Sequence, residues 1–438
     1  MKRIVLLLGF SLAVALVAAP VASAHAILVS ASPLPGAVLR VPPRQLDLYF
    51  DDVVRPLVGE VVRNSDGRVV STAVRNAGPN HVAIALRAGL GKGAYTVRWQ
   101  VLSDDGHRVG SVYAYGVGVG TPPPIPSLAP PPSGVAWLDV LVRGLLYAGV
   151  LVAFGALAFG DLVWQPVLRR FARDGADVET AVAGGVRLVS RIAASACYVA
   201  SSAAAAEIVR MPNAVTRFGR LTTALVVAAA IACALALIVS ASASRPRRRV
   251  LLALTGAVSG FALVTPSLGG HALDRSQPAI LSLVVDIAHV AAAGVWIGGL
   301  VVLVLLVPMA TRALEPTTRR ALLAATARRF SVVALTAVTV IVVSGAIRAL
   351  FELATPEQLL TTTYGRLLMV KIVLLTLLVG AGFLNRVRFV PRVVAEAERP
   401  GAGVAFAMLR RNVAVELVLL AGALAAVALL VQSRPGIG

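Results

Sequence analysis

The chain has 438 residues, 58% of them hydrophobic, and a mean hydropathy of +0.83. Because ordinary soluble domains are only about 45–50% apolar, this composition excludes a purely soluble protein and indicates several membrane spans. The formal net charge of +20 does not indicate nucleic-acid binding. Most of the excess is Arg in short segments between apolar runs, where positive charge orients membrane proteins.

The first 24 residues have the layout of a secretory signal peptide. Met1-Lys2-Arg3 is basic, an apolar run follows from Ile4 to Val17, and Ala22-Ser23-Ala24 is a small-x-small cleavage sequence. Cleavage after Ala24 would make His25 the first residue of the mature protein. Its free α-amine and imidazole can together chelate a metal that favours nitrogen in a square-planar site, and Cu(II) is the leading candidate.

Residues 25–118 are expected to form a β domain. Apolar and polar side chains alternate along Tyr95–Val101, as in a strand with one buried face, and shorter alternations occur at Leu46–Phe50 and Val82–Leu86. Turn signals lie between these runs, at residues 33–36, 64–67 and 89–93. Several short strands in about a hundred residues predict a β-sandwich or a small barrel. The domain has no cysteine, so its fold needs no disulfide.

The histidines of this domain indicate where a metal would bind. Asp105 and His107 flank Gly106, so a tight turn can bring both side chains to one ion. The amine and imidazole of His25 with Asp105 and His107 form an N3O ligand set that suits tetragonal Cu(II). Asp-Gly-His alone is better explained as a solvated turn, but its combination with an amino-terminal His favours the metal site. His81 matches no such pattern and is interpreted as a surface residue.

Residues 119–134 are rich in Pro from Thr121 onward, which is typical of a semi-rigid extended linker. The chain is then helical and apolar over residues 135–438. Most of its long apolar stretches match the roughly 20 residues that cross a bilayer, which predicts eight spans. They lie at about 137–163, 180–208, 221–243, 250–268, 278–308, 330–350, 366–384 and 412–432.

Loop charges test the direction of these spans. If the β domain is exported, the loops on the inner side carry eighteen Arg and those on the outer side, with the C-terminal tail, carry seven. Inner loops of membrane proteins are enriched in Lys and Arg. The charges therefore agree with the signal peptide and place the β domain and the C-terminus outside the cytoplasmic membrane.

Ionisable residues inside apolar spans are expensive and often functional. Asp286 and His289 are three residues apart in the fifth span, on one helical face, and His271 lies in the outer loop before it. These three residues could form a copper route on the side where copper arrives. The alternative is a structural hydrogen bond between Asp286 and His289, with His271 in solvent. Glu416, late in the chain, is interpreted as a partner of Arg410 or Arg411.

The β domain resembles the CopC family of periplasmic copper-binding proteins. The resemblance is carried by His25-Ala26-Ile27-Leu28, by Ser32-Pro33 and Pro35-Gly36-Ala37, and by Tyr95–Ser103 leading into Asp105-Gly106-His107. It implies a cupredoxin-like or immunoglobulin-like sandwich with a tight Cu(II) site at the amino terminus, His25, Asp105 and His107. Some members add a Met-rich Cu(I) site, but no Met lies between Met1 and Met211. The domain therefore lacks the soft ligands that Cu(I) needs.

Residues 135–438 contain a second set of short motifs: Asp286-Ile287-Ala288-His289 with Trp296–Leu300, Tyr364–Leu368 with Lys371 and Asn385, and Glu416. Through these motifs the region resembles the CopD family of inner-membrane copper proteins, which are associated with bringing copper through the cytoplasmic membrane and are partnered with or fused to CopC. Together the two resemblances indicate a CopC–CopD fusion.

The leading hypothesis is a copper-binding protein, not an enzyme, that captures Cu(II) outside the cytoplasmic membrane and promotes copper import or homeostasis. Its partners would be copper ions and the lipid bilayer, and the membrane domain would carry Cu(I) or Cu(II). The linker holds the β domain near the membrane and raises the local copper concentration there.

Three alternatives remain open. The first is a chaperone, resistance or assembly factor that delivers copper to exported copper proteins without transport. The second is a haem protein with His271 and His289 as ligands, and the third is a copper oxygenase built on His25. Since the chain has no Walker motif, it is not expected to pump copper with ATP.

Overall fold

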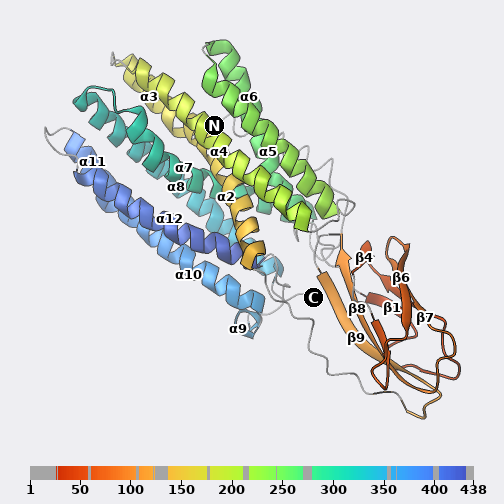
Figure 1. The fold of residues 1–438 in the computed structure, drawn as a ribbon. Helices are drawn as coiled ribbons and strands as arrows, with labels where there is room; N and C mark the ends of the chain where they lie inside the picture. Colours follow the sequence, from red (N-terminus) through yellow and green to blue (C-terminus); the bar gives the residue numbers. More distant parts are fainter. Residues whose placement is uncertain are drawn as a thin grey trace.

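A β domain is followed along the chain by a bundle of long helices, and it lies at one end of that bundle (Figure 1). The predicted signal peptide and most of the predicted linker lie outside the residues that the structure describes, so the domain boundaries stay predictions. The structure is a computed structural model, and it describes residues 26, 28–57, 61–104, 108–121, 123, 137–174, 178–210, 217–242, 244–269, 279–352, 357–361, 363–397 and 404–430.

The β domain has two sheets. The order of strands is β1-β3-β7-β6 in the first sheet and β2-β9-β8-β4 in the second, where β5 also pairs with β8. The two residue pairs between β2 and β9 are parallel, and the other ladders are antiparallel. The strands are β1 (Leu28–Ser32), β2 (Val38–Leu39), β3 (Gln45–Phe50), β4 (Val54–Pro56), β5 (Val61–Asn64), β6 (Ser71–Gly78), β7 (His81–Leu86), β8 (Gly93–Ser103) and β9 (Arg108–Val117).

Alternating side chains of both sheets form a single core between them. Leu46 and Leu48 of β3 and Val97 of β8 are fully buried in the same apolar cluster. The rings of Phe50 and Trp99 meet edge to face, with 5.3 Å between their centroids, and so join the two sheets. The alternation in the sequence therefore folds into a β-sandwich, as predicted.

The helical domain contains long helices interrupted by two short π-helical segments, η1 (Gly160–Trp164) and η3 (Asn385–Phe389). The helices are α2 (Trp137–Phe159), α3 (Gln165–Arg173), α4 (Glu179–Arg210), α5 (Arg217–Ala241), α6 (Arg245–Gly269), α7 (Ala279–Ala310), α8 (Pro316–Glu352), α9 (Gln358–Thr361), α10 (Thr363–Leu384), α11 (Val390–Ala397) and α12 (Val404–Leu430).

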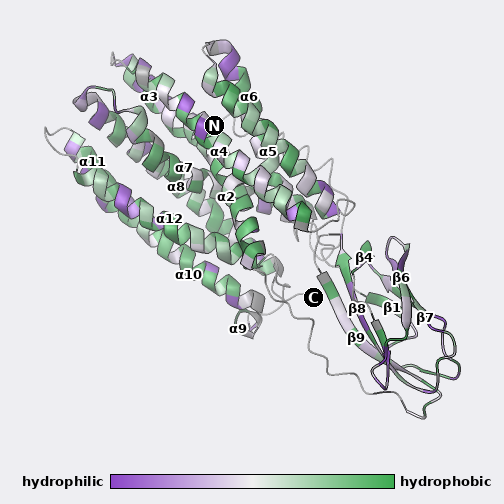
Figure 2. Cartoon of the chain, in the orientation of Figure 1, coloured by the Kyte–Doolittle hydropathy of each residue, from purple (hydrophilic) through white to green (hydrophobic). Residues whose placement is uncertain are grey.

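Eight helical stretches of the described chain are long and apolar enough to cross a membrane, which confirms the fold class predicted from the sequence. Apolar residues dominate the bundle, and the most hydrophilic residues lie mainly near the helix ends (Figure 2). The stretches are Val140–Arg173, Ala181–Val209, Arg217–Ala241, Pro246–Leu268, Ile280–Leu305, Pro316–Leu350, Gly365–Ala397 and Val404–Leu430.

Helix α2 packs against α4, α6, α7 and α12. Its crossing with α7 brings backbone against backbone: a Cβ added at Gly155 would lie 1.9 Å from the carbonyl oxygen of Gly294, and one added at Gly298 would lie 2.6 Å from the Cα of Gly155. Small residues permit such close helix packing in membranes. This crossing holds α7, which carries Asp286 and His289, against α2.

Candidate metal centre

The residue that follows His25 is tied to the end of strand β8. The backbone N–H of Ala26 donates a hydrogen bond of 3.1 Å to Oγ of Ser103. Ala26 is 1% exposed and Ser103 is fully buried, so the contact belongs to the interior of the sandwich. The start of the predicted mature protein is therefore attached beside the β8–β9 hairpin.

That hairpin contains the other predicted ligands. Its last described ladder pair is Leu102 with Arg108, and β8 ends at Ser103. His25, Asp105 and His107 themselves lie outside the described residues, as does His271. The structure thus describes the flanks of the predicted Cu(II) site, and the ligand set stays a prediction.

Asp104, beside this predicted ligand set, contacts the helical domain. Its Oδ1 accepts the backbone N–H of Arg217 at 2.6 Å, and its carbonyl oxygen accepts that of Phe218 at 2.9 Å. These are the first two residues of α5. Because the first N–H groups of a helix have no partner within the helix, Asp104 acts as an N-terminal cap supplied by the β domain.

The contact continues to the end of α6. The guanidinium of Arg217 is buried and donates a hydrogen bond from Nη2 to the carbonyl oxygen of Leu268, near the end of α6. Asp104, the start of α5 and the end of α6 therefore meet at one end of the bundle.

One interpretation of the sequence was a hydrogen bond between Asp286 and His289. The structure gives each of these side chains a different partner. Both contact α8, which packs against α7. Asp286 forms an ion pair with Arg348, and Nδ1 of His289 lies 3.0 Å from Oγ of Ser344. Asp286 and His289 are three residues apart on one face of α7, and their partners on α8 are four residues apart. Residues with this spacing lie on neighbouring turns of one helix face, so the two pairs can meet where the helices pack.

A second buried ion pair in the same end of the bundle was missed by the sequence analysis. Nε of Arg143 on α2 donates to Oε1 of Glu207 on α4 at 2.9 Å, and the side chains are 10% and 9% exposed. The guanidinium of Arg143 also lies over the ring of Phe218, 5.7 Å from its centroid. The available signal was the presence of opposite charges inside two apolar runs.

Glu416 has different partners from those considered in the sequence analysis. It is 1% exposed, and its Oε1 accepts hydrogen bonds from the amide groups of Asn385 and Asn412. Arg410 and Arg411 are exposed on α12. This carboxyl group therefore belongs to an amide cluster between α10, η3 and α12.

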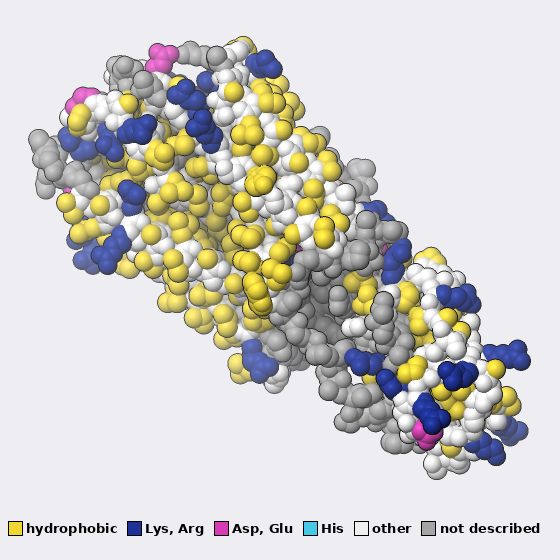
Figure 3. Space-filling model, viewed as in Figure 1, with side chains coloured by type: hydrophobic (Ala, Val, Ile, Leu, Met, Phe, Trp, Pro, Cys, Tyr) yellow, Lys and Arg dark blue, Asp and Glu magenta, His cyan; other side chains and the backbone are white. Residues whose placement is uncertain are grey.

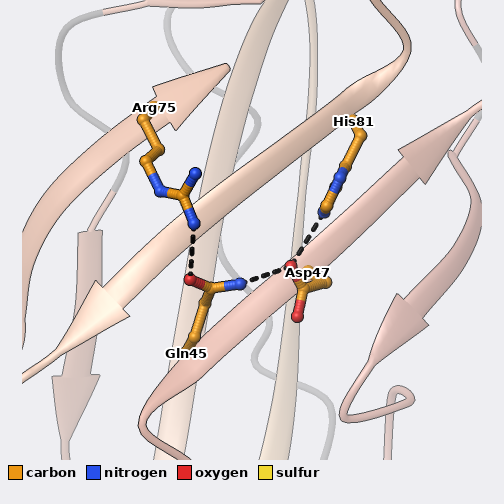
Figure 4. Close-up of polar contacts among 4 residues, drawn as sticks. All are labelled: Gln45, Asp47, Arg75 and His81. Carbon is orange, nitrogen blue, oxygen red and sulfur yellow. Dashed lines mark hydrogen bonds and ion pairs between the residues drawn. The ribbon is translucent and has the colours of Figure 1, made fainter. Parts of the chain in front are cut away.

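His81 was interpreted from the sequence as a surface residue, but its side chain is only 20% exposed and has several partners. Its Nε2 lies 2.8 Å from Oδ1 of Asp47, which also accepts a 2.7 Å hydrogen bond from Gln45 (Figure 4). The His81 ring stacks on Tyr49 with centroids 4.3 Å apart. Arg75 completes the group by donating to Oε1 of Gln45. These contacts across β3, β7 and β6 give His81 a structural role.

Other ligands for a metal are scarce in the described chain. Within it, no three His, Cys, Asp or Glu side chains are grouped so that they could hold a metal ion. Burial raises the pKa of the phenols of Tyr113 and Tyr115 well above their usual range, so neither is a phenolate at neutral pH. The predicted ligands His25, Asp105 and His107 lie outside the described chain.

Comparisons with known proteins match both parts of the chain. Residues 28–118 match the CopC domain, and residues 324–430 match Copper resistance protein D. The chain is 27% identical over 361 residues to the Copper transport protein CutJ of Bacillus subtilis (strain 168), covering 80% of this chain. The match spans 65% of that relative's length.

Two solved structures are similar to the β domain. CopC from Methylosinus trichosporium OB3b is 29% identical, covering 21% of this chain and 93% of that one with a TM-score of 0.20. PcoC, a methionine-rich copper resistance protein from Escherichia coli, is 22% identical, covering 22% of this chain and 99% of that one with a TM-score of 0.19.

The two family matches occupy successive parts of the chain, in the order expected from the residues that carry each resemblance. The first coincides with the β-sandwich, and the second covers most of α8 and all helices from α9 to α12. These matches support a CopC–CopD fusion with a copper-related function, as the sequence resemblances indicated.

Proposed function

We propose that this protein captures Cu(II) outside the cytoplasmic membrane and passes copper into its helical domain for import, acting as a transporter and not as an enzyme. The observation that supports this most strongly is the contact of Asp104 with the start of α5. Asp104 directly precedes Asp105, so the proposed capture site would lie close to the start of α5.

The proposed ligands are the α-amine and imidazole of His25, with Asp105 and His107. The hydrogen bond between Ala26 and Ser103 supports the set, because it joins the immediate neighbour of His25 to the turn that contains the other two ligands. Three nitrogen donors and one carboxylate suit Cu(II) better than Cu(I).

The distribution of charge supports the proposed sidedness. Lys and Arg side chains gather at the end of the bundle farthest from the β domain, beyond a broad apolar belt (Figure 3). Cytoplasmic ends of membrane proteins carry such an excess. The β domain would then lie outside, at the end of the bundle that contains Asp286, His289 and Arg217.

Copper that leaves the capture site would next meet His271 and then the polar residues of α7. Asp286 is engaged by Arg348, so copper binding at Asp286 requires Arg348 to release it. His289, near Ser344 on the adjacent turn, offers an imidazole for copper. We propose that this rearrangement admits copper to the bundle.

Cellular copper accumulation tests import. Cells that lack the gene should contain less copper than cells with the wild-type protein, and His289→Ala should behave like the deletion. His81→Gln is the matched control, because His81 is engaged with Asp47 in the β domain and should leave accumulation unchanged. Higher copper on deletion would indicate export, and unchanged copper would favour delivery to exported copper proteins; either result would overturn import.

The capture site has its own test. A Gly inserted before His25 moves the free amine away from the imidazole, so Cu(II) affinity should fall by at least tenfold in a copper titration monitored by electron paramagnetic resonance. His81→Gln should again bind like the wild type. An unchanged affinity after the insertion would remove the α-amine from the ligand set.

A further inference from the structure

A buried carboxyl group in the last helix has no role in the copper route proposed above. Glu416 is 1% exposed and lies twelve residues after the first residue of the 27-residue helix α12. At about 1.5 Å per residue, this places it near the middle of the helix and about 8 Å deeper than Arg411. The position lies well inside the span Val404–Leu430.

Amide groups surround this carboxyl group. Oε1 of Glu416 accepts hydrogen bonds from Nδ2 of Asn385 and, at 3.3 Å, from Nδ2 of Asn412. Asn412 also donates to Oδ1 of Asn385 at 2.8 Å and to the carbonyl oxygen of Ala381 at 3.3 Å. The three side chains therefore form one connected cluster between α12 and the junction of α10 with η3.

The backbone at this junction is unusual. Asn385 is the first residue of the π-helical segment η3, and the N–H of Val390 bonds to the carbonyl oxygen of Asn385, five residues earlier. Single π-helical turns inside α-helices occur often at functional sites. Here the turn contains the Asn that donates to Glu416, which supports a role beyond simple helix packing.

The charged groups on the elements around Glu416 are paired with other residues, distant from Glu416 or exposed. Asp286 on α7 is paired with Arg348, and Arg143 on α2 is paired with Glu207. Lys371 on α10 lies fourteen residues before Asn385, about 21 Å along the helix axis, and Glu396 on α11 accepts the N–H of Ala405. The remaining cations on η3, α11 and α12 are exposed: Arg386, Arg388, Arg392, Arg410 and Arg411.

Glu416 thus differs from Glu207 and Asp286, the other buried acids among the described side chains of the bundle, each of which has an Arg partner. A carboxylate removed from water without a cation is strongly destabilised, and such a group takes up a proton instead. Amide donors offset only part of that cost. The neutral, protonated acid is therefore the stable form in this cluster.

We propose that Glu416, with Asn385 and Asn412, is a proton-binding site of the membrane domain and that copper movement depends on its protonation. The ligand is a proton. The Glu416 carboxylate takes it up and releases it again to water without any redox change. The coupling to copper rests on the import function proposed above. It would let the proton gradient, rather than ATP, influence copper movement.

Infrared spectroscopy of the purified full-length protein tests the proton site without copper. At neutral pH we expect a carbonyl stretch of a protonated carboxylic acid that is lost in Glu416→Gln. Asn385→Ala should shift this band by removing a hydrogen bond to it. Glu207→Gln is the matched control and should leave the band unchanged, because its carboxylate is paired with Arg143.

Two infrared results would overturn the proton site. Absence of the band in folded wild-type protein at neutral pH would show that Glu416 is ionised. Loss of the band on addition of Na⁺ at constant pH would show that the cluster binds an alkali cation. A melting temperature for each variant, measured in the same detergent, establishes that the compared proteins are folded.

Copper flux into proteoliposomes tests the coupling. In the wild type, an imposed pH gradient should change the initial rate of copper uptake several-fold, and Glu416→Gln should lose this response. A response that persists in Glu416→Gln would overturn the coupling. If the wild type moves no copper at any pH, import itself fails, whereas the infrared band still reports the proton site separately.

Discussion

Single charged residues inside the bundle are stabilised by partners on neighbouring helices. Arg143 with Glu207 joins α2 to α4, and Asp286 with Arg348 joins α7 to α8. Burying an isolated charge in this apolar surrounding would raise the free energy of the folded protein. Each member of a pair therefore offsets the cost of burying the other. Removing one member leaves an uncompensated buried charge, whereas removing both leaves only a change of packing.

The Arg143–Glu207 pair gives a stability prediction. Arg143→Met should destabilise the protein by on the order of 3 kcal/mol, because Glu207 stays buried without its cation. Thermal unfolding of the purified protein in detergent measures this effect. The double variant Arg143→Met, Glu207→Met should recover most of the loss. If the double variant is as unstable as the single one, the energetic cost does not arise from the unpaired carboxylate.

At the scale of helices, the hydropathy of the sequence predicts where the membrane spans lie, but capping interactions determine where the helices begin. Helix α8 begins at Pro316, fourteen residues before the predicted start at residue 330. Glu315 accepts the N–H groups of Thr317 and Thr318 at 2.9 and 3.2 Å, and Pro is well suited to the first helical turn. An apolar window cannot detect this Arg-containing first part of the helix.

Glycines decide how closely the helices α2 and α7 approach. Gly298→Ala should destabilise the protein by about 1–3 kcal/mol, because its Cβ would lie 2.6 Å from the Cα of Gly155. Thermal unfolding in detergent measures this change. Gly382→Ala on α10 is the matched control, since nothing lies within 4 Å of its added Cβ. Equal effects of the two substitutions would argue against a tight crossing.

At the scale of the whole molecule, the β domain and the bundle are joined at Asp104, 113 residues before its partner Arg217. The same end of the bundle contains the Arg217–Leu268 contact and the ion pairs Arg143–Glu207 and Asp286–Arg348. Asp104, which precedes the proposed ligand Asp105, is therefore at the end of the bundle that contains these polar contacts. The contact is small, so we expect it to govern transfer of copper more than overall stability.

Asp104 provides the test of this arrangement. Asp104→Ala removes an N-terminal cap that is worth about 1 kcal/mol and should lower copper uptake several-fold while leaving Cu(II) affinity unchanged. Asp104→Asn retains the Oδ1 acceptor and should restore uptake. Asp66→Ala, in an exposed turn near the other end of β8, is the matched control. Normal uptake by Asp104→Ala would show that this contact does not serve transfer.

The sequence by itself determined the β domain, the eight spans and the resemblance to CopC and CopD, since strand alternation, apolar length and short motifs are local signals. It also singled out His25, Asp105 and His107, which lie outside the described residues. Only the tertiary structure decided that Asp286 faces Arg348, that Glu416 faces Asn385 and that Asp104 caps α5. These pairs are from 31 to 113 residues apart. Which of them meet depends on how helices cross and domains dock, and no local pattern encodes that geometry.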